Sequence, residues 1–66
     1  MNKISGYRRM IGHTQKTIAK ELGISKQSYW MKETGKTPFT DKEKLKFKLM
    51  LKPLFPTITI DEIFFS

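Results

Sequence analysis

Apolar residues recur at helical spacing through the first half of the chain, and a glycine follows each periodic stretch. Glycine reaches the left-handed conformation that ends many helices, because it has no Cβ to clash with the preceding turn. Thr14 and Ser25 precede the second and third stretches, and their hydroxyls can cap a helix N-terminus. The pattern therefore predicts three short helices, over residues 3–11, 15–22 and 26–34. The three glycines are Gly12, Gly23 and Gly35.

The segment from residue 41 to residue 52 admits two interpretations. Thr40 and Glu43 have the spacing of a capping box, in which each side chain bonds the backbone N–H of the other residue. This box favours a helix over 41–52. Four apolar residues nevertheless alternate with Lys and Met, which is the period of a strand. They are Leu45, Phe47, Leu49 and Leu51. We prefer the helix, because the capping box supplies a physical mechanism and the alternation is short.

A second capping box, Thr59 with Glu62, predicts a short last helix over 60–64. The alternative is an edge strand over 57–60, paired with the segment before Pro53. Sixty-six residues are enough for one small domain, so we treat 1–66 as a single unit. The expected fold is all-α, a compact domain of four or five helices. The alternative fold is α+β, with a C-terminal hairpin.

Charge adds a first indication of function. The chain holds 13 Lys and Arg against 6 Asp and Glu, a formal net charge of +7. Residues 1–36 contain eight basic and two acidic side chains, whereas residues 37–66 contain five and four. A basic half beside a nearly neutral half suggests one face for a polyanion and another for packing or a protein partner.

Composition excludes several kinds of chemistry. The chain has no Cys and one histidine, His13, so disulfides, thiolate catalysis and Cys- or His-rich zinc sites are not expected. No acid–base pair or phosphate loop is apparent, and we expect no enzyme, metal, cofactor or small-molecule ligand. No apolar run reaches the roughly 18–20 residues of a membrane span, and the N-terminus lacks the apolar stretch of a secretory signal. We therefore expect a soluble, cytoplasmic protein that does not bind membranes.

The most informative stretch is 15–34, where two predicted helices meet across a short turn that contains Gly23. This is the arrangement of a helix-turn-helix. It needs a small residue where the helices cross, which Ala19 provides, and apolar residues that point inward from both helices. The inward set is Ile18, Leu22, Ile24 and Tyr29.

This stretch resembles the Cro/repressor-like helix-turn-helix family of phage and bacterial regulators. The resemblance is carried by Arg8, by the run TQKTIAKELGISKQS over 14–28, and by ETGK over 33–36. It extends to IDEIF over 60–64, which is similar to the short last helix of such domains. The resemblance covers most of the chain and implies a lambda-repressor-like, DNA-binding fold.

The resemblance also implies roles for individual residues. The third helix would read bases in the major groove, and its chemistry suits that role, since Gln can bond adenine and Lys guanine. The implied base contacts are Lys26, Gln27, Ser28 and Met31. The implied phosphate contacts are Gln15, Ser25 and Lys36, to which Arg9 and Lys16 can be added on their charge. Arg8 and Glu33 match the family's structural ion pair, which ties the first helix to the end of the third.

One position departs from the family pattern. Lys32 stands near the end of the third helix, where the family has an apolar residue, and Trp30 comes two positions earlier. Either the Lys32 stem packs while its ammonium reaches solvent, or the helix is rotated or shortened there.

Residues 53–66 are rich in large apolar side chains, some of which must close the core. The others are expected to form a surface for a second copy or another protein, because exposed apolar patches usually mark partner sites. The candidates for this surface are Phe55, Ile58, Ile63, Phe64 and Phe65. The expected function is a Cro-like repressor, a possible homodimer that binds a near-palindromic double-stranded operator. The alternative is an antirepressor or modulator that binds another repressor protein.

Overall fold

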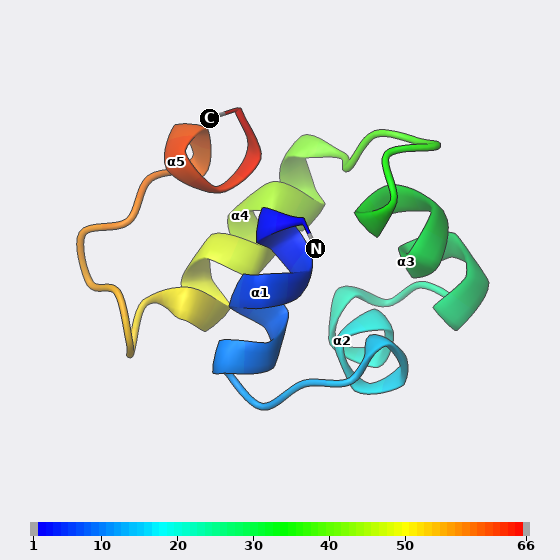
Figure 1. Cartoon of the computed structure of the whole chain (residues 1–66), viewed down its shortest axis with the longest axis horizontal. Coiled ribbons are helices and arrows are strands. Elements are labelled where there is room, and N and C mark those ends of the chain that lie inside the picture. Colours follow the sequence, from blue (N-terminus) through cyan, green and yellow to red (C-terminus); the bar gives the residue numbers. More distant parts are fainter. Residues whose placement is uncertain (1, 66) are drawn as a thin grey trace.

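A computed structural model describes residues 2–65 of the chain, which form five α-helices and contain no strand (Figure 1). The helices are α1 (Lys3–Met10), α2 (Gln15–Leu22), α3 (Lys26–Glu33), α4 (Asp41–Leu51) and α5 (Ile60–Phe64). The all-α expectation is confirmed, and the alternative of a C-terminal hairpin is wrong.

The ends of α2 and α3 are set by local hydrogen bonds. The Thr14 hydroxyl accepts from the backbone N–H of Thr17, and the Ser25 hydroxyl accepts from that of Ser28. Gly23 ends α2 in the left-handed conformation, with φ at +73°. These bonds span at most four residues, which is why the sequence pattern located both helices correctly.

Helix α4 shows why the alternating pattern was misleading. Phe47 and Leu51 are fully buried, whereas Leu45 and Leu49 are 48% and 50% exposed. A strand would have placed all four on one face, whereas residues four apart share a helix face. The Thr40 and Glu43 capping box is present in both directions and begins the helix.

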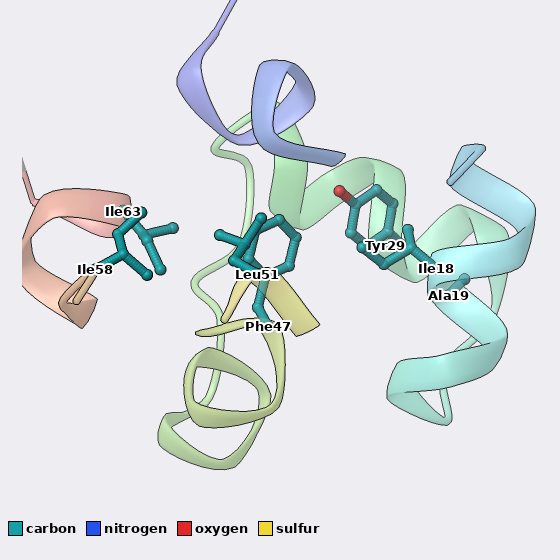
Figure 2. Packing of buried hydrophobic residues seen from close by; sticks show 7 residues of the cluster. All are labelled: Ile18, Ala19, Tyr29, Phe47, Leu51, Ile58 and Ile63. Carbon is teal, nitrogen blue, oxygen red and sulfur yellow. The ribbon is translucent and has the colours of Figure 1, made fainter. Parts of the chain in front are cut away.

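The core runs across the whole molecule, with α4 at its centre. Figure 2 shows Phe47 and Leu51 between the C-terminal pair, Ile58 and Ile63, and a cluster from α2 and α3. That cluster consists of Ile18, Ala19 and Tyr29. Helix α1 adds Ile4, Tyr7 and Ile11, the stripe expected from the sequence, as partly buried residues. The helices thus share one continuous core.

Among residues 2–65, no helix combines the length and the apolar character that crossing a membrane requires.

Candidate nucleic-acid interface

Helices α2 and α3 pack against each other across a tight turn, as expected of a helix-turn-helix. The backbone N–H of Ile24 donates to the Ala19 carbonyl at 3.0 Å, which folds the chain back onto the end of α2. Ala19 is 2% exposed, and Ile18 and Tyr29 are fully buried. Leu22 and Ile24 are partly buried against the same cluster. All four side chains expected to point inward do so.

The outer side of α3 carries the residues expected to contact bases. Lys26 and Gln27, in the first turn, are exposed, and Ser28 and Met31 are partly buried. Trp30 is 39% exposed. With Tyr29 turned into the core, α3 offers a polar first turn to solvent, which is the end that enters the major groove in this class of motif.

The residues expected to bind phosphate surround this helix in the chain. Arg9 lies in the last turn of α1, Lys16 in the first turn of α2, and Lys36 follows Gly35 after α3. All three are exposed. Within residues 2–65, neither Arg9 nor Lys16 forms an ion pair, so their charges are available to a polyanion. The Lys36 ammonium lies 5.6 Å from the centre of the Trp30 ring.

Gln15 and Ser25 make internal bonds as well. The Gln15 amide donates to Glu33 Oε1 at 3.0 Å, and the Ser25 hydroxyl accepts the Ser28 N–H at 3.0 Å. A glutamine NH₂ carries two N–H groups and a serine hydroxyl carries one donor. Each side chain therefore retains capacity for a phosphate oxygen while its position is held by the protein.

Glu33 is the centre of a buried hydrogen-bond network that supports α3. Arg8 Nε lies 2.8 Å from Glu33 Oε2, and the same oxygen accepts from the Tyr29 hydroxyl at 2.5 Å. Arg8 also donates to the His13 carbonyl at 2.9 Å. The expected Arg8–Glu33 pair is confirmed, and it joins α1, the following loop and α3. No buried side-chain N or O atom in the described chain lacks a partner.

The environment of this network keeps both of its charges. Burial raises the pKa of Glu33, but hydrogen bonds from Arg8, Tyr29 and Gln15 outweigh it and hold the pKa below its ordinary value. Burial acts to lower the pKa of Arg8, and the bonded Glu33 carboxylate more than reverses that effect. Burial, together with Glu33, raises the pKa of Tyr29, which remains a neutral donor. At neutral pH the network therefore consists of the charged Arg8–Glu33 pair and the neutral Tyr29 hydroxyl, which donates to Glu33.

Comparisons with known proteins leave the family open. A scan against protein-family models and searches of curated proteins and solved structures find no match to this chain.

Two contributors to this region were missed at the level of sequence. Asn2 caps α1 by accepting from the Ser5 N–H, and its amide donates to the Glu33 carbonyl at 2.7 Å. Asn is a preferred N-cap, so its position before the first helix was a usable signal. Its bond to the end of α3 joins residues 31 positions apart and could not be anticipated from local pattern.

Lys32 has a partner that neither sequence interpretation included. Its ammonium bonds Glu43 Oε1, and both side chains are 11% exposed. Helix α3 continues through Lys32 and ends at Glu33, one residue before the expected end at 34. Glu43 also caps α4, so the pair connects the end of α3 to the start of α4. The sequence signal for this pair was Lys32 itself, because a lysine at a position that is usually apolar needs an acidic partner nearby.

The expected partner surface in residues 53–66 needs correction. Ile58 and Ile63 are 8% and 2% exposed, so they are core residues and have no surface to offer a partner. Phe55 packs edge-on against Tyr7 at 5.8 Å, and Phe64 lies 5.1 Å from Phe39, which leaves both partly buried. Of the five candidates, Phe65 alone, at 65% exposed, lies largely on the surface. A core this small needs the C-terminal side chains for its own closure.

Proposed function

We propose that this protein is a Cro-like transcriptional regulator that binds double-stranded DNA in a sequence-specific manner through α3. The observation that carries the proposal is the contrast between the two sides of that helix. Lys26 and Gln27 stand exposed in its first turn, while Tyr29 and Glu33 are held in the core by α1 and α2. A rigid helix that offers polar, base-compatible side chains is what direct readout requires.

In this proposal the first turn of α3 supplies the specificity. Gln27 bonds adenine through N6 and N7, and Lys26 donates to O6 and N7 of guanine. Ser28 contacts a base or phosphate, and Met31, one turn further along, contacts a thymine methyl group.

Phosphate contacts supply most of the affinity. Gln15 and Lys16 lie in the first turn of α2, and Ser25 caps α3. Arg9 and Lys36 lie before and after this pair of helices in the chain. Neutralising several phosphates releases counterions, which makes binding fall steeply as salt rises. The +7 net charge of the chain has the sign that this role needs.

We propose further that the protein acts in the cytoplasm as a dimer, without catalysis of its own. Two copies would place their recognition helices about 34 Å apart, one turn of DNA, on a near-palindromic operator. Occupation of that site would exclude polymerase.

The experiment that tests the proposal is a selection of tight binders from a random duplex library at about 150 mM salt, a concentration at which non-specific binding is weak. We expect an inverted repeat to be enriched, with half-sites about 10 base pairs apart. Enrichment of a single half-site without a repeat would refute the dimer but would still support sequence-specific binding by a monomer. If no sequence is enriched, the DNA-binding function is wrong.

A second function, modulation of another repressor by direct binding, is favoured by one observation. Leu54 and Phe65 are 53% and 65% exposed near the C-terminal end. Lys32, the departure from the family pattern, is paired with Glu43 and lends this alternative no support. Failure of the DNA selection, combined with stoichiometric binding to a purified repressor, would favour it.

A further inference from the structure

An open groove lies between the start of α1, the loop that joins α3 to α4, and α5. Its volume is about 640 Å³, within the range of sites that take a ligand or several side chains of a partner. The groove begins where α3 ends, at the opposite end of that helix from Lys26 and Gln27. It is therefore separate from the residues proposed to read bases, although it shares Lys36 with the proposed phosphate contacts.

The floor of the groove is aromatic. Phe39, Phe64 and Phe65 line it, and the first two are partly buried. Phe39 and Phe64 pack with their ring centres 5.1 Å apart, and Phe64 also contacts the fully buried Phe47 at 5.8 Å. The floor is thus an extension of the core and is held rigid by it, whereas Phe65 stands 65% exposed at its edge.

The rim of the groove is cationic. Lys3, Lys36 and Lys44 line it together with the buried Lys32, which is paired with Glu43. Glu33, the one carboxylate among the described lining residues, is buried against Arg8. For the part of the chain that the structure describes, the ammonium groups of Lys36 and Lys44 contact aromatic rings and no carboxylate. Within residues 2–65, Lys36 and Lys44 therefore bring positive charge to the rim that no carboxylate neutralises.

From this arrangement we propose that the groove docks an acidic peptide segment of a partner protein, with an aromatic or branched aliphatic side chain seated on its aromatic floor. Carboxylates on either side of that side chain would face Lys36 and Lys44. The positive charge of the rim favours acidic residues in the peptide, and the apolar floor favours an aromatic or aliphatic side chain.

The same geometry argues against a single-stranded nucleic acid. Bases bind by stacking on the open face of an aromatic ring. The Lys44 ammonium lies over the Phe65 ring at 4.5 Å and over the Phe64 ring at 6.0 Å, so a face of each ring is already occupied. A peptide side chain needs only the apolar floor of the groove, and Lys36 and Lys44 remain available to its flanking carboxylates.

The test is a selection of 12-residue peptides from a random displayed library against the full-length protein, followed by affinity measurements with the enriched peptides. We expect peptides that carry acidic residues around one aromatic or aliphatic residue. Phe65→Ser and Lys44→Glu should each weaken them by about tenfold or more, as for a central interface residue. No enrichment, or enrichment of peptides without acidic residues, would overturn the proposal.

Two matched controls separate the groove from general effects. Leu49→Ser removes an apolar side chain that is 50% exposed on α4, and Lys46→Glu makes the same charge change as Lys44→Glu two residues along. Neither residue lines the groove, so both variants should bind the peptides as the parent protein does. Circular dichroism would check that each variant folds. Equal losses in the controls and the groove variants would refute a site in the groove.

Binding to DNA and to a single strand is measured on the same variants. Lys44→Glu and Lys46→Glu should weaken duplex binding equally, because neither residue belongs to the proposed DNA surface. The two proposals can thus fail independently, since peptide binding does not require an operator. If a 12-nucleotide oligothymidine bound, and lost affinity only in Lys44→Glu and Phe65→Ser, the groove would be a single-strand site and the peptide assignment would be wrong.

Discussion

Glu33 connects more of this molecule than any other polar residue described above. Its carboxylate accepts from Arg8, Gln15 and Tyr29, and its backbone carbonyl accepts from Asn2. These donors come from α1, its N-cap, α2 and α3. One buried carboxylate therefore sets the angle at which the helices meet, and with it the direction in which the first turn of α3 faces.

Replacement of this carboxylate by an amide should destabilise the fold strongly. Glu33→Gln leaves the buried Arg8 guanidinium without its counter-charge, a change that typically costs about 3–5 kcal/mol. Urea unfolding followed by circular dichroism would measure it. Glu21→Gln makes the same charge change at an exposed position and should stay within about 0.5 kcal/mol of the parent. If the two variants were equally stable, the network would not support the fold.

Glu33 should also make the domain sensitive to acid. Its pKa in the folded state lies below its ordinary value, so the unfolded chain binds the proton more readily. The stabilisation is then complete above the unfolded pKa of about 4.3 and is lost as pH falls through the lower folded pKa. The pKa of Glu43 is also lowered. Burial acts to raise it, but the hydrogen bond from Lys32 and the capping bonds with Thr40 outweigh that effect. Urea midpoints measured at a series of pH values should drop in this window, and by less in Glu33→Gln.

Gln27 should determine specificity at one base position. Gln27→Ala is expected to cost about 1–3 kcal/mol on the selected operator and to relax the preference at a single base pair. The residue is exposed, so the fold should be unaffected. Titration of duplexes that carry each of the four base pairs at that position would measure the change. A loss equal for all four would remove Gln27 from the base-reading set.

Lys36 should contribute affinity without specificity. Lys36→Ala is expected to weaken all duplexes alike and to reduce the slope of log K against log salt by about one. Binding measured at several salt concentrations would show this change. A loss confined to the operator would mean that Lys36 reads bases.

At the scale of the elements, helix ends are determined by single residues with special backbone requirements. Gly23 ends α2 with φ at +73° and would meet no atom within 4 Å if it gained a Cβ. Gly6 lies inside α1 and would likewise meet nothing. The two glycines therefore differ in backbone conformation alone, and the same substitution should have opposite effects on them.

We expect Gly23→Ala to destabilise the domain by about 1–2 kcal/mol, the cost of a left-handed conformation for an L-residue. Gly6→Ala should stabilise it by about 0.5–1 kcal/mol, because alanine is the better helix former. Thermal and urea unfolding of the two variants would provide the comparison. Destabilisation by both would show that Gly6 has a packing role.

At the scale of the whole molecule, the C-terminal segment completes the core. Ile58 and Ile63 pack with Phe47 and Leu51, on the opposite side of those two residues from the cluster of α2 and α3 (Figure 2). The main role of the residues after α4 is therefore to complete the core. Phe65 is their most exposed large apolar side chain and the one best placed to contact a partner.

Truncation after Pro53 should leave the chain unfolded. It removes two buried isoleucines, each worth about 2–5 kcal/mol, from a domain whose total stability is about 5–15 kcal/mol. Loss of the cooperative thermal transition in circular dichroism would confirm this result. A truncated chain that still unfolded cooperatively would show that α1–α4 form a sufficient core.

The sequence by itself determined the five helices. Their ends depend on caps and glycines that act within three or four residues, and the capping box at Thr40 was correctly preferred over the alternation of Leu45 to Leu51. The Arg8–Glu33 pair was also anticipated, through a resemblance and not through spacing. The inward residues of α2 and α3 followed from the helical period.

Only the tertiary structure decided which distant residues meet. The pairing of Lys32 with Glu43, the bond from Gln15 to Glu33, and the burial of Ile58 and Ile63 all join separate elements. The groove with its aromatic floor and lysine rim exists only once α1, α5 and the loop after α3 are brought together. Local hydrogen bonds are encoded within a single turn of chain, whereas these contacts depend on how all five helices share one small core.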